Sequence, residues 1–321
     1  MGELEQLAER IREITGWRRV DKPRILTDTS DPFSLRRGDI LRLGGKDFVV
    51  KGHKYETRFG IGDQPKYWVL SAVAIETAEP KIIKVVFHEE FHVHIGIFRI
   101  HCFRSPEKES RVLDLVRGDH RFMQGYTVPD GHNNQVRIID FIKGPTIFEH
   151  IFNINKTHEQ YFAEDLPGIL RNLAECIRAV AFLHQHETCH GDIRNDHIIL
   201  EPDTGRYRWI DFDLNQHVSD YDVWSLGNIL NYATGKGITT FDKVFKTKEI
   251  DAKVKVSLEA GDASGFYEYR IMNLKKVYPY IPQKLNDILL HFTLHPKSYY
   301  ATVTELLGDY LEMLDSDFPV S

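Results

Sequence analysis

The chain has 321 residues, of which 42% are hydrophobic, and a net charge of −6 at pH 7. A chain of this length and composition can bury one large core or form two lobes. The negative charge argues against nucleic acid as the main partner, and no uninterrupted apolar run is long enough to cross a membrane. The three cysteines are odd in number and lack metal-type spacing, which together with the missing signal peptide predicts a cytoplasmic protein.

The first third of the chain predicts one helix followed by antiparallel strands. Leu4, Leu7, Ile11 and Ile14 recur at helical spacing before Gly16, which predicts a short amphipathic helix docked on the rest of the protein. Two hairpins are then expected, the first in DILRL-GGK-DFVVKG and the second in KYWVLSAVAIE-TAEP-KIIKVVF.

The pattern changes from strands to helices along the rest of the chain. Ser105 and Pro106 are the expected N-cap and first residue of a helix in SPEKESRVLDLVRG. One more strand pair is predicted in RFMQGYTV and QVRIIDFI. After Gly144 helices dominate, including a long one in LPGILRNLAECIRAVAFLHQH and others from Asp222 onward. The chain is therefore predicted to be an α+β protein with a β-rich first lobe and a helical second lobe.

The stretch LHQHETCHGDIRNDH, followed by RYRW and IDFD, carries the strongest functional signal. It resembles the catalytic loop and metal-binding motif of the protein kinase-like superfamily, in particular bacterial-type serine/threonine kinase-like proteins with a His-Gly-Asp loop. The likeness runs from about residue 47 to the C-terminus. It places Asp192 at the catalytic aspartate, which accepts or orients the proton of an attacking hydroxyl. Arg194 falls at a phosphate-contacting position, and Asp211 at the position that holds Mg²⁺.

The same resemblance implies nucleotide-binding residues in the first lobe. Lys84, in KIIKVVF, is the candidate anchor for the α- and β-phosphates, and Glu109 is its expected ion-pair partner. Gly52 opens GHKYETRFGIGD, the irregular counterpart of the family's phosphate-covering loop. Asp140 and Ile142 belong to IIDFIKG, the expected connector whose backbone meets adenine.

The resemblance also divides the chain and names its cofactors. It implies an N-terminal helical extension over 1–37, a kinase-like N-lobe over 38–140, a hinge over 141–145 and a C-lobe over 146–321. The implied cofactors are ATP with Mg²⁺ or Mn²⁺. The acceptor is an unknown protein or small molecule, and no nucleic acid or membrane partner is expected.

The metal-binding and phosphate-binding motifs depart from the family pattern. His197 stands where the family has an asparagine metal ligand, and imidazole suits softer transition metals better than Mg²⁺. Asp196 and Asp213 are neighbouring carboxylates that can compensate. The glycines of the phosphate loop, Gly52, Gly60 and Gly62, do not follow Gly-x-Gly-x-x-Gly. The sequence thus predicts an altered metal chemistry.

The segment after the metal-binding motif is short. Only 11 positions separate Asp211 from Asp222, which leaves no room for a regulatory phosphorylation site or a peptide cradle. Gly191 replaces the arginine that would read a phosphorylated loop, and Tyr299 replaces a late arginine that pairs with the missing segment. We therefore expect no switching by phosphorylation of this segment. The charged and aromatic stretch from 235 to 282 is either a replacement platform or a structural insertion.

A rival motif occurs in the first half of the chain. His88-Glu89-Glu90-Phe91-His92 satisfies the HExxH pattern of zinc metalloproteases, which needs both histidines one turn apart on a helix. The alternation of FHVHIGIF has a period of two and predicts a strand instead.

Four functional readings follow. The leading hypothesis is an ATP-dependent phosphotransferase acting on Ser/Thr hydroxyls of a protein, with Asp192 as base and Asp211 holding the metal. The alternatives are a nucleotide-binding pseudokinase that acts as a regulator or scaffold, a small-molecule kinase and, most remotely, a zinc metalloprotease.

Overall fold

The computed structural model describes residues 2–319 except for residues 21, 22, 59, 60, 96, 97, 217, 219 and 220. The chain forms two compact units, and each is assembled from two separate pieces of sequence. The first unit comprises Met1–Glu89 and Arg104–Ile142, and the second comprises Glu90–Phe103 and Lys143–Ser321. Residues 90–103 thus group with the second unit. The limits of the predicted extension, lobes and hinge stay predictions.

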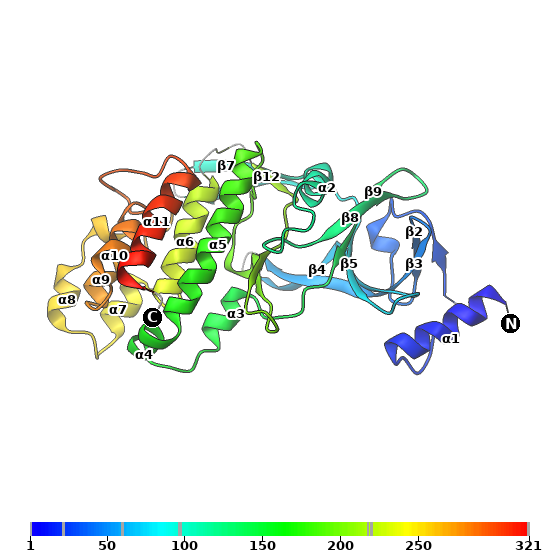
Figure 1. The fold of residues 1–321 in the computed structure, drawn as a ribbon, viewed down its shortest axis with the longest axis horizontal. Helices are drawn as coiled ribbons and strands as arrows, with labels where there is room; N and C mark the ends of the chain where they lie inside the picture. The colour runs from blue at the N-terminus through cyan, green and yellow to red at the C-terminus, as the bar shows by residue number, and fades with distance from the viewer. Residues whose placement is uncertain are drawn as a thin grey trace. The chain divides into compact units, whose positions relative to one another are not determined.

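A mostly antiparallel sheet forms the basis of the first unit (Figure 1). Among the described residues, seven strands run in the order β1-β2-β3-β4-β5-β9-β8, and only the short strand β1 pairs parallel with its neighbour. The strands are β1 (Ile25–Leu26), β2 (Ile40–Leu43), β3 (Lys46–Arg58), β4 (Ile61–Ala74), β5 (Pro80–Lys84), β8 (Gly125–Pro129) and β9 (Gln135–Asp140).

The predicted strand pairs of this sheet are confirmed. Strands β2 and β3 form the first hairpin, β4 and β5 the second, and β8 and β9 the third. The β2–β3 turn uses Gly44 and Gly45 with φ of 56° and 75°. Two successive left-handed residues match the twist of a two-residue hairpin, and glycine adopts this backbone without steric cost.

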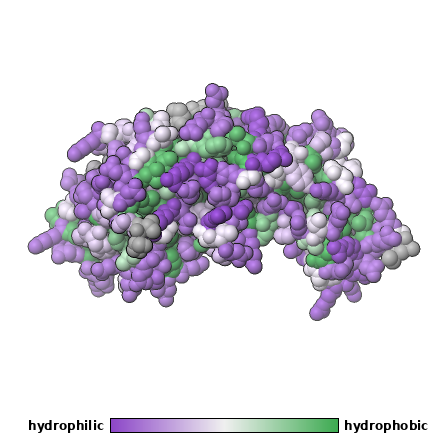
Figure 2. Space-filling view, viewed as in Figure 1, coloured by the Kyte–Doolittle hydropathy of each residue, from purple (hydrophilic) through white to green (hydrophobic). Residues whose placement is uncertain are grey.

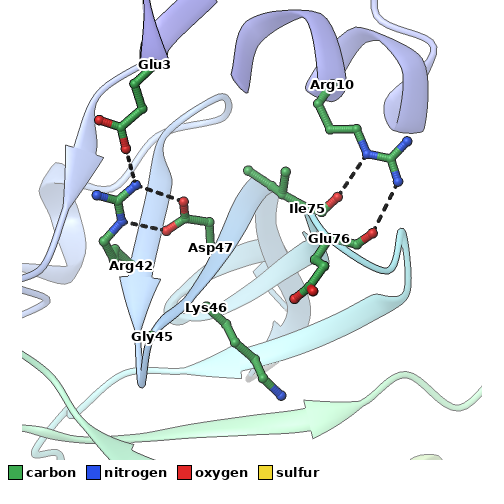
Figure 3. Close-up of a pocket in the computed structure, with 8 residues that line it drawn as sticks. All are labelled: Glu3, Arg10, Arg42, Gly45, Lys46, Asp47, Ile75 and Glu76. Atoms are coloured by element: carbon green, nitrogen blue, oxygen red, sulfur yellow. Dashed lines mark hydrogen bonds and ion pairs between the residues drawn. The ribbon is translucent and has the colours of Figure 1, made fainter. Parts of the chain in front are cut away.

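The N-terminal helix α1 (Glu3–Thr15) docks on this sheet as predicted, and it ends at Gly16. Ile11 is fully buried among side chains of the sheet, namely Ile40, Val49, Val73 and Ile75. Arg10 ties the helix to the strand end, because its guanidinium donates to the carbonyls of Ile75 at 3.1 Å and Glu76 at 3.2 Å (Figure 3).

A polar hollow of about 530 Å³ lies beside this helix (Figure 3). Arg42, one of three basic residues in its lining, is held by Asp47 at 2.8 Å and by Glu3 at 2.7 Å. Because Glu3 belongs to α1 and Arg42 to β2, their ion pair helps to dock the helix on the sheet.

Helix α2 (Pro106–Leu115) begins where the sequence predicts. The Ser105 hydroxyl accepts a hydrogen bond from the Lys108 N–H at 3.2 Å, and Pro106 occupies the first helical position. An N-cap of this kind satisfies a backbone donor that the helix itself leaves without a partner. The helix therefore starts at a defined residue, which sets the position of Glu109 one turn later.

The second unit is mainly helical. Its helices are α3 (Ile147–Phe152), α4 (His158–Glu164), α5 (Leu166–Gln185), α6 (Tyr221–Thr234), α7 (Phe241–Lys246), α8 (Ala252–Ser257), α9 (Leu274–Val277), α10 (Gln283–Leu290) and α11 (Val303–Asp317). Its strands are β6 (Glu90–Ile95), β7 (Phe98–Arg104), β10 (Ile198–Leu200), β11 (Tyr207–Trp209) and β12 (Leu214–Gln216).

The predicted long helix α5 is the centre of this unit. It contacts α6 and α11, which lie beside it in Figure 1. The buried Tyr310 hydroxyl donates to the Leu170 carbonyl at 2.8 Å, and the Trp209 indole donates to the Cys176 carbonyl at 3.0 Å. The second bond joins β11 to α5 and so places the short β10–β11 hairpin that follows the His-Gly-Asp loop.

The stretch from 235 to 282 folds into α7, α8 and α9 and contributes to the core. Ile271, Met272 and Leu274 are fully buried. The stretch therefore has at least a structural role, and its service as an acceptor platform stays a prediction.

The predicted α+β class is confirmed, with a strand-rich first unit and a helical second unit. These are the parts expected of a protein kinase-like fold. Among the described residues, no helix has the length and apolarity needed to cross a bilayer. The face drawn in Figure 2 is mostly hydrophilic, with small hydrophobic areas between the polar ones.

Candidate functional site

A buried ion pair in the first unit joins two of the predicted nucleotide-binding residues. The Lys84 ammonium, at the end of β5, lies 2.6 Å from Glu109 Oε1 on α2. The Glu109 side chain is fully buried and that of Lys84 is 6% exposed. Burial removes the competing water, so the pair holds the long lysine side chain in one orientation.

Arg137, which sequence reasoning missed, binds the other oxygen of the same carboxylate. It lies on β9 directly opposite Lys84 in the strand register, and its Nε is 3.2 Å from Glu109 Oε2. Its guanidinium also donates to the carbonyls of Val85 at 3.3 Å and Gln135 at 2.9 Å. The available signal was a single arginine in the otherwise apolar run VRII.

The other predicted nucleotide-binding residues lie along the same sheet. Gly52 is inside β3 at a shift of the β3–β4 register, with φ of 151°. Asp140 ends β9 and accepts a hydrogen bond from Lys81 Nζ at 2.7 Å, while Ile142 is buried just beyond. Gly60 lies outside the described residues.

A second group of predicted residues comes together within the second unit. Asp192 and His197 belong to the loop between α5 and β10, and Asp211 follows β11. One ligand atom from each of these three residues lies within 4.8 Å of the others. Asp211 has φ of 70°, a left-handed backbone that costs a non-glycine residue roughly 1 kcal/mol or more. Strain of this kind often accompanies ligand sites.

His197 occupies the middle of this cluster and is almost fully buried. Its Nδ1 lies 2.8 Å from the backbone carbonyl oxygen of Asp192. Its Nε2 lies 3.5 Å from Asp211 Oδ2. The ring is therefore fixed between the predicted base and the predicted metal ligand.

The loop that carries this cluster is anchored by Asp222 at the start of α6. Its carboxylate accepts hydrogen bonds from the backbone N–H groups of His190 at 2.8 Å and Gly191 at 2.9 Å, and it contacts His184 Nε2 at 3.0 Å. Although burial by itself would raise the pKa of Asp222, these hydrogen bonds and the nearby histidines hold it below the ordinary value. The sequence marked Asp222 as the start of a helix and gave no sign of this anchoring role.

Arg194, the predicted phosphate contact, is engaged by a neighbour. Its Nε and Nη2 bind the two oxygens of Asp196 at 2.9 and 2.6 Å. Both side chains are partly exposed, at 40% and 44%. Exposed pairs are weak enough to be exchanged for another anion. Asp213, the other nearby carboxylate, is buried.

The strand predicted around HExxH is confirmed, and it belongs to a hairpin that packs in the second unit. Strand β7 lies between β6 and β12 in a three-stranded sheet. The inner face of the hairpin packs on residues that follow the predicted metal-binding motif. This cluster contains Phe91, Val93, Ile100, Cys102, Leu214, Tyr221 and Phe266. Burial and the charge of Asp192 raise the pKa of Cys102 to about 11, so this thiol stays protonated.

This strand structure excludes the helical arrangement that the HExxH motif has in zinc proteases. His92 lies in strand β6, and residues 85–89 have no helical structure. The two histidines of the motif are therefore not one helical turn apart, which is the spacing that a zinc protease requires.

Comparisons with known proteins find likenesses among solved structures. No protein-family model matches the chain, and a search of curated proteins finds no match. Among solved structures the chain is similar to the crystal structure of Rad53 1–466 in complex with AMP-PNP, with 13% sequence identity and a TM-score of 0.45. The match covers 81% of this chain and 65% of the Rad53 chain, slightly under two thirds of its length. Because the sequence identity and the TM-score are both low, this likeness assigns no role to any residue of the chain.

The first prediction concerns the hairpin. Ile100→Asp places a charge at a buried position against Leu214, so we expect amide hydrogen exchange to rise together in β6, β7 and β12, with α5 unchanged. Hydrogen exchange with mass spectrometry measures this. Arg99→Asp, at an exposed neighbouring position, is the matched control and should change little. Faster exchange in the hairpin with β12 unaffected would show that the two are not coupled.

The second prediction concerns Arg137. Arg137→Met keeps most of the side-chain volume but removes one donor from a buried carboxylate, so we expect the free energy of unfolding to fall by about 3 kcal/mol. Urea denaturation measures it. The control is Arg117→Met, since Arg117 is 68% exposed in its pair with Asp114 and should contribute at most about 0.5 kcal/mol. Equal effects of both substitutions would contradict a special role for the buried network.

The third prediction is a pH dependence. Because its pKa is lowered in the folded chain, ionised Asp222 stabilises the fold above its ordinary pKa, and this contribution is lost as pH falls through the folded-state value. Asp222→Asn should lower the free energy of unfolding by about 3 kcal/mol at pH 7. Below about pH 4 the difference in this free energy between the variant and the wild type should become smaller. Urea midpoints at several pH values test this, with exposed Asp203→Asn as control. A difference in unfolding free energy that stays constant or grows in acid would exclude a stabilising role for the ionised Asp222 carboxylate.

Proposed function

We propose that this protein is an ATP-dependent phosphotransferase that acts on Ser/Thr hydroxyls of a protein acceptor. The observation that carries the proposal is the cluster of Asp192, His197 and Asp211, whose ligand atoms lie within 4.8 Å of one another. These residues stand on the loop and motif that resemble the catalytic parts of protein kinases. Phosphoryl transfer asks mainly for positioning and for charge neutralisation, and such a cluster supplies both.

Asp192 is the proposed base. Its side chain is partly exposed, so an acceptor hydroxyl can reach it, while the Asp222 carboxylate holds the preceding backbone of the loop. A carboxylate in this position accepts or orients the hydroxyl proton as the oxygen attacks phosphorus.

Asp211 and His197 are the proposed metal ligands. A divalent ion held there would neutralise charge on the phosphates of the nucleotide. The residues fit such an ion, because a carboxylate oxygen and an imidazole nitrogen face each other at 3.5 Å in a largely buried site. Mg²⁺ and Mn²⁺ are the proposed metals.

Lys84 is the proposed phosphate anchor. Glu109 orients it at 2.6 Å, and Arg137 adds a second positive charge to the same network. An ammonium group held in one orientation can bind the phosphates of ATP. Gly52, Asp140 and Ile142 stay proposed nucleotide contacts that come from the family resemblance.

Arg194 is proposed to stabilise charge on the transferring phosphoryl group. In the structure its guanidinium binds Asp196, and the exposure of the pair allows a phosphate to replace that carboxylate. Arginine forms paired hydrogen bonds with phosphate in the same way as with carboxylate.

Activity is proposed to be independent of phosphorylation of the short segment after Asp211. Strand β12 lies in this segment and is already paired with β7. A strand that is held by its neighbours needs no added phosphate to become ordered. The cytoplasmic location also stays a proposal, based on the cysteine content.

The second candidate function is a nucleotide-binding pseudokinase that acts as a regulator or scaffold. It is favoured by His197 in place of the asparagine and by the engagement of Arg194 with Asp196. A small-molecule acceptor is the other open choice, since the short segment leaves no evident cradle for a peptide.

The fourth prediction tests the base. With γ-labelled ATP and either Mg²⁺ or Mn²⁺, the wild type should label itself, an added protein or a small hydroxyl acceptor. Asp192→Asn should lower transfer by about 10²-fold or more while nucleotide binding persists. Asp203→Asn, exposed in the turn between β10 and β11, is the control and should retain full activity.

The outcome separates the candidates. Transfer that survives in Asp192→Asn would exclude Asp192 as the base. No transfer by the wild type with either metal, together with nucleotide binding in a thermal-shift assay, would favour the pseudokinase.

A further inference from the structure

The hydrogen bond of His197 determines which of its ring nitrogens is free to bind an ion. A backbone carbonyl only accepts hydrogen bonds, so the contact of His197 Nδ1 with the Asp192 carbonyl at 2.8 Å places the hydrogen on Nδ1. In the neutral ring the lone pair is then on Nε2. Histidines that bind metals through one nitrogen commonly donate the other N–H to a backbone carbonyl.

The free nitrogen faces a carboxylate. His197 Nε2 lies 3.5 Å from Asp211 Oδ2, and the two side chains are 5% and 11% exposed. Their approach in a buried place calls for a positive charge between them, which either a bound cation or a second proton on the ring supplies, and the metal-binding test below distinguishes the two. Two ligands that are each about 2.1 Å from one ion can be at most about 4.2 Å apart, and the observed distance lies within this limit.

The nature of the nitrogen donor decides which ion fits. Mg²⁺ prefers oxygen ligands in a strict octahedral arrangement and gives up its water reluctantly. Imidazole binds first-row transition ions more strongly, and their affinity for a given nitrogen-containing site rises along the series that begins with Mn²⁺. The amide oxygen of the asparagine that stands here in the family would make no such distinction.

We infer that His197 is the metal-specificity residue of this site and that its Nε2, together with Asp211, selects a first-row transition ion such as Mn²⁺ over Mg²⁺. This inference rests on the metal site of the proposed function. It is separate from catalysis, because an ion can bind at His197 and Asp211 whether or not phosphate is transferred.

The test is metal binding measured on the full chain by electron paramagnetic resonance, with and without AMP-PNP. Mn²⁺ should bind at least about tenfold more tightly than Mg²⁺ in competition, and echo-envelope modulation should reveal a coordinated nitrogen. Growth with ¹⁵N-labelled histidine should shift that modulation to the ¹⁵N pattern. This labelling needs no substitution and shows whether any of the 16 histidines binds the ion, and the substitution of His197 then identifies which one.

His197→Asn restores the oxygen donor of the family. It should abolish the nitrogen modulation and reduce the preference for Mn²⁺ over Mg²⁺ by about tenfold or more. The matched control is His186→Asn, since His186 is exposed at the end of α5 and its Nδ1 lies 2.9 Å from the Phe182 carbonyl of its own helix. The control should keep both the modulation and the preference.

The outcomes separate this inference from the proposed function. Mn²⁺ bound without a histidine nitrogen, an unchanged preference in His197→Asn, or no Mn²⁺ binding in either nucleotide state would overturn the inference. Nitrogen-coordinated Mn²⁺ in a protein that transfers no phosphate would support the inference and would exclude the proposed phosphotransferase function.

Discussion

The buried carboxylate of Asp222 is the interaction on which the candidate site of the second unit depends. It accepts hydrogen bonds from the backbone N–H groups of His190 and Gly191, which lie in a loop outside any helix or sheet. Because α6 is held against α5 in the core, this carboxylate transfers the rigidity of the helices to an irregular loop. Asp192 follows directly, and its carbonyl in turn orients His197. One buried charge thus determines the positions of a proposed base and a proposed metal ligand.

Each unit contains a polar network of its own. In the first unit, Glu109 lies between Lys84 and Arg137 and holds the lysine ammonium in one orientation. In the second unit, Asp192 and Asp211 flank His197, so that network is suited to a cation. Both networks are largely buried, where charge interactions are strong and an unsatisfied group is costly. Substitution of a single charged side chain in either network is therefore expected to change which ion or group the network can bind.

The departures from the kinase pattern form a consistent set. The segment after Asp211 is short, and Gly191 stands where an arginine would read a phosphorylated residue. In place of a long segment, the hairpin of β6 and β7 pairs with β12 and covers Leu214 with apolar side chains. The order of this region thus comes from strand pairing and hydrophobic burial, which are present in the chain as synthesised.

The sequence by itself determined the class of fold and the order of most strands and helices, and through the family resemblance it named Lys84, Glu109, Asp192, His197 and Asp211 as candidates. These features are local, because periodicity, caps and motif spacing are written in neighbouring residues. Only the tertiary structure decided that Arg137 binds Glu109, that the β6–β7 hairpin packs on β12, and that the Asp192 carbonyl selects the tautomer of His197. Such contacts join residues far apart in the chain or depend on the path of the backbone, and no local pattern specifies them.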